Sequence, residues 1–234
     1  MKIAVGVLCH NQHENKRVGL FEDSLRSIRK NQPDYLAVVD NGSTDGTAER
    51  LATLPEYVHI PRIPGFPPAN TCGYGMNKLA ALLRNKADIS VLSNDDIVWK
   101  PGAFDILREV WAEAPDELAI ISGLVEPTFQ LPDQEPWNEP LGTAELAGQT
   151  LLIRRSVPGG AWTYPSEYAD VIFPVSTFHG VDDLPACHKL TAQGRLVACL
   201  DLAEHAGAEH STWGNGSERW LIEPLPQLKE RFGI

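Results

Sequence analysis

Two short segments of the sequence place carboxylates and amides soon after apolar runs, and both could contact a nucleotide. Asp40 follows the run 35–39 and begins a glycine-containing loop. Its carboxylate could accept hydrogen bonds from a ribose or a base, while the loop brings backbone amides near a ligand. Asp95 follows the run 89–92, and Mg²⁺ or Mn²⁺ could bridge it to the closely spaced charges of a nucleoside diphosphate. Each segment also has a simpler interpretation, a helix cap at 40–47 and a solvated turn at 94–96.

The elements that must position these residues alternate along the chain. Short apolar runs alternate with segments whose apolar residues recur at helical spacing, which predicts an α/β fold with a parallel, doubly wound sheet. The alternation breaks at 126–143, a segment with four prolines that we expect to lie over the sheet. The predicted strands are 3–9, 35–39, 58–60, 89–92, 118–125, 148–153 and 196–202, and the predicted helices lie around 21–28, 48–54, 76–84 and after 101–104.

Polar side chains collect where three predicted strands end. They are His10 with Asn11, Asp40 with Asn41, and the run 93–96. In open α/β sheets the ligand crevice lies outside the carboxyl ends of the strands. We therefore expect the three segments to meet at one site.

The composition limits the classes of function. The 234 residues are 43% hydrophobic and 22% charged, which is ordinary for a folded domain. The 20 Lys and Arg residues against 31 Asp and Glu give a net charge of −11, so we expect no nucleic acid partner, and the surplus of carboxylates is compatible with a cation site. The four cysteines form no CxxC pair and are expected to be reduced thiols. The sequence shows no cleavage-site pattern and no apolar stretch of ~18 residues, so we expect no transmembrane segment and a cytoplasmic location.

The loop that begins at Asp40 resembles the signature of family-2 glycosyltransferases. Those enzymes typically have a strand followed by Asp-(Asp/Asn)-Gly-Ser-x-Asp-Gly-Thr, and residues 40–47 reproduce this pattern. The resemblance implies a GT-A-like, mostly parallel sheet flanked by helices in a single domain at 1–210, with a nucleotide-sugar-binding half (1–125), an acceptor-side half (126–210) and a C-terminal extension (211–234). It also implies an inverting transfer of a hexosyl or deoxyhexosyl group from a nucleotide-diphosphate-sugar donor to a glycan or other hydroxyl acceptor, with Mn²⁺ or Mg²⁺ as cofactor.

The resemblance assigns roles to further residues. The run 91–96 is similar to the family's Leu-Asp-x-Asp-Asp, a DxD motif, with Ser93 in place of the first Asp, and this matches Asp95 to the metal-binding carboxylate. Residues 75–78 are similar to the family's Arg-Asn-x-Gly segment, with Met76 in place of the Arg. The nucleotide contacts that the resemblance implies are His10, Asn11, Asp40, Asn41, Gly42, Ser43, Asn77 and Asn94.

A general base and a further metal ligand are expected in the C-terminal half. In the family a Glu-Asp pair precedes Asp-Leu, a basic residue and a glycine, and alignment on Lys189 places Asp182 and Asp183 on that pair. Asp183 then matches the base that deprotonates the acceptor hydroxyl, and Asp182 at most orients it; a helix N-terminus is the structural alternative for the two. His205 is expected to complete the metal shell, with His210 as the competing choice.

Two rival functions stay open at this point. A sugar-phosphate nucleotidylyltransferase should show a Gly-rich loop with Arg and Lys soon after the first strand, where this sequence has His-Asn-Gln-His at 10–13. A catalytically inactive nucleotide-sugar-binding homologue is compatible with Ser93 at the first DxD position. The sequence does not distinguish UDP-, GDP- and dTDP-linked donors.

Overall fold

The structure is a computed structural model of the 234-residue chain. It describes residues 1–61, 72–123, 141–155, 157, 160–168, 183–200 and 206–207, with only the backbone at 168, 183–185 and 206–207. None of the helices in this part of the chain is long and apolar enough to cross a membrane.

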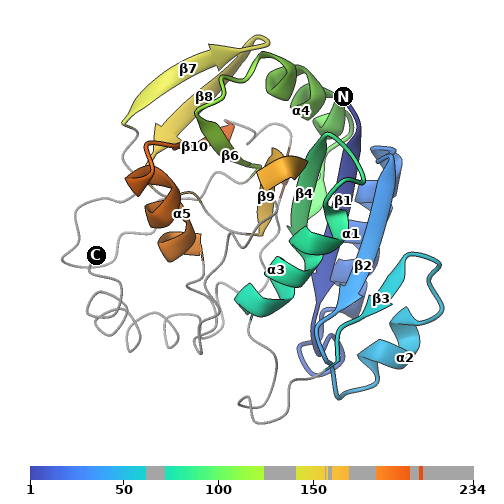
Figure 1. Cartoon of the computed structure of the whole chain (residues 1–234). Helices are drawn as coiled ribbons and strands as arrows, with labels where there is room; N and C mark the ends of the chain where they lie inside the picture. Colours follow the sequence, from blue (N-terminus) through green and yellow to red (C-terminus); the bar gives the residue numbers. More distant parts are fainter. Residues whose placement is uncertain are drawn as a thin grey trace.

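Nine strands of the described residues form one large sheet (Figure 1). They are β1 (Ile3–Cys9), β2 (Tyr35–Asp40), β3 (Tyr57–His59), β4 (Ile89–Asn94), β6 (Leu118–Ser122), β7 (Gly142–Leu146), β8 (Gln149–Arg154), β9 (Ala161–Pro165) and β10 (Leu196–Leu200). Their order across the sheet is β3-β2-β1-β4-β9-β6-β10-β8-β7. A second, two-stranded sheet pairs β5 (Val98–Trp99) with β11 (Ala206–Gly207).

The predicted α/β sheet flanked by helices is confirmed, and its strand pairings are mixed. β3, β2, β1 and β4 are parallel to one another, as are β6 and β10. β9 is antiparallel to both β4 and β6, and β8 is antiparallel to β10 and β7. The parallel neighbours β3, β2, β1 and β4 form the half of the sheet next to Asp40 and Asp95, and the antiparallel pairings lie in the other half.

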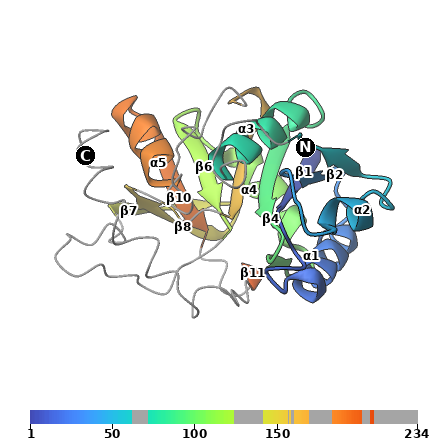
Figure 2. The same ribbon diagram turned by 90° about the horizontal axis from the view of Figure 1, so that it is seen from below.

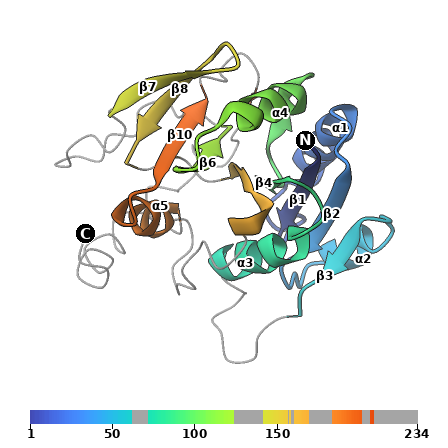
Figure 3. The same ribbon diagram turned by 45° about the horizontal axis from the view of Figure 1, so that its top comes forward.

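Short connections explain the reversed strands. β7 and β8 are joined by the two residues Ala147 and Gly148, both with positive φ (48° and 71°), which is the geometry of a tight hairpin turn. Only residues 155–160 separate β8 from β9. A parallel neighbour needs a crossover of about a dozen residues or more, so neither connection can continue the βαβ pattern. Figure 3 shows the β7–β8 hairpin at the edge of the sheet opposite β3.

Helices cover both faces of the sheet. α1 (Val18–Lys30) and α4 (Ala103–Glu113) contribute to one hydrophobic core, and α3 (Cys72–Leu83) and α5 (Asp183–Ala192) to another. Figure 2 shows α3 and α5 on one side of the sheet and α1 on the other. α3 lies so close to β1 that a Cβ atom on Gly6 would be 2.4 Å from the buried Leu79 side chain, so any larger residue at position 6 would push the helix away.

The predicted helix faces are confirmed, while several boundaries shift. Apolar residues predicted to share the inner faces of α1 and α4 are buried, among them Phe21, Ile28 and Leu107. α2 (Thr47–Leu51) ends three residues earlier than predicted, and β6 ends at Ser122. β7 and β9 were not predicted as strands, because β7 lies partly within the proline-rich segment and the polar Thr163 interrupts β9.

Candidate functional site

The sheet register brings the polar strand ends to one edge. Asp40 pairs with Cys9 across β1 and β2, and Asn94 pairs with Leu8 on the other side of β1. His59, at the end of β3, pairs with Asp40. Because these four strands are parallel, their carboxyl ends lie together, and the segments after β1, β2 and β4 form the candidate site.

Asp40 is fully buried and organises the loop that follows it. The amide of Ser43 donates to both carboxylate oxygens, at 3.2 and 3.3 Å, and His59 Nδ1 lies 2.9 Å from Oδ2. Asn41 packs against α3, where a Cβ atom on Gly75 would lie 2.7 Å from its side chain. Glycine at position 75 is therefore required for the close approach of α3 to this loop.

The signature loop is held by side chains rather than by regular structure. Asn11, itself at a φ of 44°, accepts a hydrogen bond from the Thr44 amide at 2.9 Å, and the amide of Asn11 donates to Ser43 Oγ at 2.9 Å. Gly42 and Gly46 both have positive φ (76° and 86°), which glycine adopts without steric cost. The segment after β1 and the loop after β2 are thus locked to each other.

Asp45 stabilises the C-terminal end of this loop through hydrogen bonds from backbone amides. It accepts hydrogen bonds from the amides of Glu14 at 2.8 Å and Thr47 at 3.1 Å. Burial raises the pKa of Asp45, but hydrogen bonds from Thr47, Glu14 and His13 outweigh that effect and lower the pKa below its ordinary value of 3.8. The lowered pKa means that the ionised form stabilises the fold.

Asp45→Ala is expected to lower the free energy of unfolding by about 1 kcal/mol at pH 7, the usual effect of removing a carboxylate that accepts hydrogen bonds from backbone amides near a helix start. Because the folded-state pKa lies below the unfolded one, this contribution is present above pH 3.8 and lost as the pH falls through the folded-state value. Urea denaturation of the two proteins at pH 7 and pH 3 measures it, with the exposed Asp116→Ala as control. An equal loss at both pH values would mean that the charge of Asp45 is not responsible.

Asp95 lies at the centre of a buried polar cluster. Gln12 Nε2 donates to its Oδ2 at 2.8 Å, and Arg17 Nη1 donates to its Oδ1 at 3.1 Å. Arg17 Nη2 also lies 3.8 Å from Asp96 Oδ2. Asp95 and Asp96 are 1% and 2% exposed, and Gln12 is fully buried. Burial raises the pKa of Asp95 to about 6 and Asp96 acts in the same direction, while Arg17 and Gln12 oppose the shift.

Gln12, Arg17 and His59 were missed by the sequence analysis. Their contacts join residues 83, 78 and 19 positions apart, respectively, and no local pattern marks such pairs. Only His59 gave a signal, since it lies in a strand that was predicted to follow the strand of Asp40. Gln12 is oriented from its other side by Arg50, which donates to Gln12 Oε1.

Ser93 points away from this cluster. It is fully buried, and the indole Nε1 of Trp99 donates to Ser93 Oγ at 3.3 Å. Ser93 lies on the same face of β4 as Val91 and Ile89, which belong to the core that α1 and α4 cover. The first position of the DxD-like motif is therefore a packing position here.

The remaining predicted residues divide into two groups. His10, Asn77 and Asn94 are partly exposed and lie at the end of β1, in α3 and at the end of β4. Asp182, His205, His210 and the side chain of Asp183 lie outside the described residues. The helix α5 begins at Asp183, which agrees with the structural alternative of a helix N-terminus at this position.

The backbone around β11 bears on the histidine prediction. Ala206 of β11 pairs with Trp99 of β5, and Gly207 pairs with Val98. β5 follows Asp95 and Asp96 almost directly in the sequence. Ala206 and Gly207 thus lie beside the chain that leaves the carboxylate pair.

The carboxylate pair fits a cation. Asp95 and Asp96 each direct one oxygen to the same guanidinium, so Arg17 stands where a positive charge is needed. Buried carboxylate oxygens are also suitable ligands for Mg²⁺ or Mn²⁺. The described residues contain no group of three or more His, Cys, Asp and Glu side chains that could hold a metal, so a metal at this pair would need ligands from the diphosphate or from beyond these residues.

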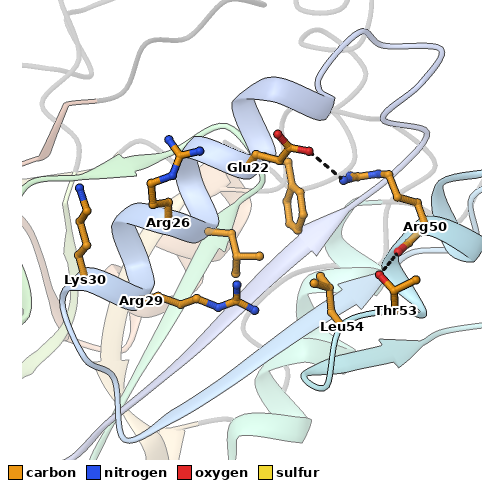
Figure 4. A pocket seen from close by; sticks show the side chains of 9 residues that line it. Glu22, Arg26, Arg29, Lys30, Arg50, Thr53 and Leu54 are labelled. Atoms are coloured by element: carbon orange, nitrogen blue, oxygen red, sulfur yellow. Dashed lines mark hydrogen bonds and ion pairs between the residues drawn. The ribbon is translucent and has the colours of Figure 1, made fainter.

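A cavity of about 690 Å³ lies beside the site rather than in it. It runs along α1 and the region of α2 (Figure 4), and neither Asp40 nor Asp95 lines it. Its cations are largely paired, since Arg29 bonds Glu56 at 3.0 Å and Arg50 lies 3.8 Å from Glu22. The lining residues are Phe21, Glu22, Leu25, Arg26, Arg29, Lys30, Arg50, Thr53 and Leu54.

Comparison with known proteins relates the chain to glycosyltransferases. No family model matches the chain. The N-acetylglucosaminyl-diphospho-decaprenol L-rhamnosyltransferase of Mycobacterium tuberculosis is 27% identical over 268 aligned positions, which cover 89% of this chain and 86% of the relative.

Solved structures share the fold. The mannosyltransferase PcManGT of Pyrobaculum calidifontis, in complex with GDP-Man and Mn²⁺, has a TM-score of 0.55 at 19% identity, covering 85% of this chain and 56% of its own. S. aureus TarS 1–349 with UDP-GlcNAc has a TM-score of 0.58 at 14% identity, with 88% and 58% covered. The chain thus spans little more than half the length of these two structures. The loop signature, the sequence relative and the shared fold together support a family-2 glycosyltransferase of the GT-A fold.

Proposed function

We propose that this chain transfers a sugar from a nucleotide-diphosphate-sugar to an acceptor hydroxyl, with inversion and with a divalent cation at Asp95. The observation that carries the proposal is the gathering of Asp40 and Asp95 at one edge of the sheet, on the strands that flank β1. Both lie in segments that match motifs of the family. The named donors of the solved relatives, GDP-Man and UDP-GlcNAc, support a nucleotide-sugar as the donor class.

The nucleotide would lie over the ends of β1, β2 and β4. Asp40 is fully buried, so its contribution includes holding the Ser43 amide and His59 in place as well as any contact with the ligand. The partly exposed polar groups that could contact the nucleotide directly are His10, Asn11, Ser43, Asn77 and Asn94, beside the buried Asn41 and Gly42.

A divalent cation would be held by Asp95, with Asp96 adjacent and His205 as a proposed further ligand. Such an ion supplies positive charge next to the diphosphate of the donor. Gln12 keeps Asp95 oriented through its 2.8 Å hydrogen bond. The pairing of β11 with β5 supports His205, because it brings Ala206 beside Trp99.

Asp183 is the proposed general base. It would take the proton from the acceptor hydroxyl as the oxygen attacks the anomeric carbon, on the face opposite the leaving diphosphate. The name of the M. tuberculosis relative describes an acceptor in which a sugar is joined through diphosphate to decaprenol. A lipid-linked saccharide is therefore the first acceptor to test, with L-rhamnose as the first sugar.

A ligand panel tests the proposal and its rivals. A ligand that binds only the native state raises the melting temperature, so UDP, GDP and dTDP are compared with and without Mn²⁺. We expect one nucleotide to stabilise the protein, more strongly with Mn²⁺, and the matching sugar donor to be hydrolysed slowly without acceptor. Binding without hydrolysis or transfer would indicate an inactive homologue. Pyrophosphate release from a nucleoside triphosphate and a sugar 1-phosphate would indicate a nucleotidylyltransferase.

His205→Ala is expected to raise the Mn²⁺ concentration for half-maximal activity, by about 10-fold or more, as the loss of a ligand to a metal does. His210→Ala is the matched control and should leave that concentration unchanged. A Mn²⁺ titration of transferase activity at saturating donor measures both. The reverse pattern would move the ligand to position 210.

A further inference from the structure

Arg17 holds the two carboxylates of the proposed metal site together. Its Nη1 atom lies 3.1 Å from Asp95 Oδ1, and its Nη2 atom lies 3.8 Å from Asp96 Oδ2. We propose that Arg17 is a built-in competitor of the divalent cation, and that it makes loading of the metal depend on the nucleoside diphosphate. The inference rests on the proposed function in assigning the metal to Asp95.

The local backbone places Arg17 at this position. The segment after β1 turns back through Asn11 and Lys16, both with positive φ (44° and 56°), and the Arg17 amide donates to the Gln12 carbonyl at 2.8 Å. The Arg17 carbonyl then accepts from the Phe21 amide at the start of α1. The backbone of Arg17 is thus fixed at a helix start, while its long side chain reaches the carboxylates.

The side chain of Arg17 is not committed to a single partner. It is 25% exposed, whereas Asp95 and Asp96 are buried. Its Nε atom has no hydrogen-bond partner among the described residues. A guanidinium has five donors in a planar fork and binds phosphate groups with two of them at once. Arg17 can therefore exchange the carboxylates for the phosphates of a ligand without leaving the site.

Competition follows from the charges. A divalent ion that coordinates Asp95 Oδ1 would lie next to the guanidinium that already contacts this oxygen, and like charges at such distances repel strongly in a buried site. The metal alone is thus opposed by Arg17. A nucleoside diphosphate brings negative charge that attracts both cations, so metal and diphosphate are expected to strengthen each other's binding, and Arg17 to enlarge this reciprocal coupling.

A simpler explanation is that Arg17 only stabilises the fold by neutralising a buried acidic pair. In that case its removal would destabilise the protein without improving the affinity for metal. The two explanations differ in the sign of one measurement, the affinity for Mn²⁺ without nucleotide.

The experiment measures Mn²⁺ binding by calorimetry and by the electron paramagnetic resonance of free Mn²⁺. The variants are Arg17→Met, Arg17→Lys and the control Arg26→Met, which removes an exposed arginine of α1 that pairs with Asp23. We expect Arg17→Met to bind Mn²⁺ alone at least about 10-fold more tightly than the wild type, since one repelling charge is gone. Arg17→Lys should lie between the two, because it keeps the charge but loses the fork, and Arg26→Met should match the wild type.

The coupling to nucleotide is measured in the same way. The factor by which UDP or GDP raises Mn²⁺ affinity should be smaller in Arg17→Met than in the wild type. Thermal denaturation checks that each variant is folded, and Arg17→Lys decides the question if Arg17→Met is not. Mn²⁺ affinity that is unchanged or weaker in the folded Arg17 variants would overturn the inference. If no nucleotide binds but Arg17→Met still gains Mn²⁺ affinity, the proposed function fails and the competition stands.

Discussion

Asp183→Asn is expected to lower the turnover number of sugar transfer by about 10²- to 10⁴-fold, the range over which general bases act. Asparagine has nearly the shape of aspartate but cannot accept the proton of the acceptor hydroxyl. Because Asp183 begins α5, the neutral amide can still occupy a helix N-terminus, so the substitution should leave the fold intact. Donor affinity is expected to change little, so kcat falls while the binding of donor is retained.

Asp182→Asn is the matched control for this prediction. It changes the neighbouring carboxylate in the same way and should cost much less, since Asp182 at most orients the base or the acceptor. Steady-state kinetics with a proven acceptor, together with donor binding by calorimetry, measures both variants. If Asp183→Asn retains near-normal transfer, the base lies elsewhere and the alignment on Lys189 is wrong.

Asp95→Asn is expected to remove the Mn²⁺-dependent part of nucleoside diphosphate binding. The loss should reach about 100-fold in affinity at saturating Mn²⁺, because the interaction of a metal with phosphoryl oxygens is worth several kcal/mol. The variant should fold, since asparagine can still accept the hydrogen bond from Gln12 and no longer buries a charge. Calorimetric titration of the preferred nucleoside diphosphate, with Mn²⁺ and with chelator, measures the effect.

Asp40→Asn and Asp105→Asn are the comparisons for that experiment. Asp40→Asn should weaken nucleoside and nucleoside diphosphate alike, with or without Mn²⁺, because Asp40 holds the loop and not the metal. Asp105, which pairs with Arg108 on the surface of α4, should have no effect. Equal losses with Mn²⁺ and with chelator for Asp95→Asn would defeat the assignment of Asp95 to the metal.

The N-terminal half of the fold could be predicted from the sequence, because its signals are local. The strand 3–9 is continuous and apolar, and the buried residues Phe21 and Ile28 of α1 recur at helical spacing. The signature loop was recognised for the same reason, because its carboxylates, its glycines and its hydroxyl residues all lie within 40–47. In each case the residues that interact are near one another in the chain, so composition and spacing suffice.

The C-terminal half was less predictable for the same reason. β9 enters the sheet between β4 and β6, and its direction depends on strands more than 35 residues earlier in the chain. β7 and β8 reverse the sheet through a two-residue turn at Ala147 and Gly148. A strand of average hydrophobicity carries no mark of its neighbour or its direction, which is why the antiparallel placement of β8 and β9 was not predicted.

The sequence by itself indicated the resemblance to family-2 glycosyltransferases, and it located Asp40 and Asp95 at or just after the ends of two strands. Only the tertiary structure decided what holds these groups. Gln12 and Arg17 reach Asp95 across 83 and 78 positions of sequence, and His59 reaches Asp40 from a neighbouring strand. A motif records which residue types follow a strand, whereas the charge next to a buried carboxylate is set by whichever distant side chain the packed sheet brings beside it. The guanidinium of Arg17 at the proposed metal site is the consequence of that packing.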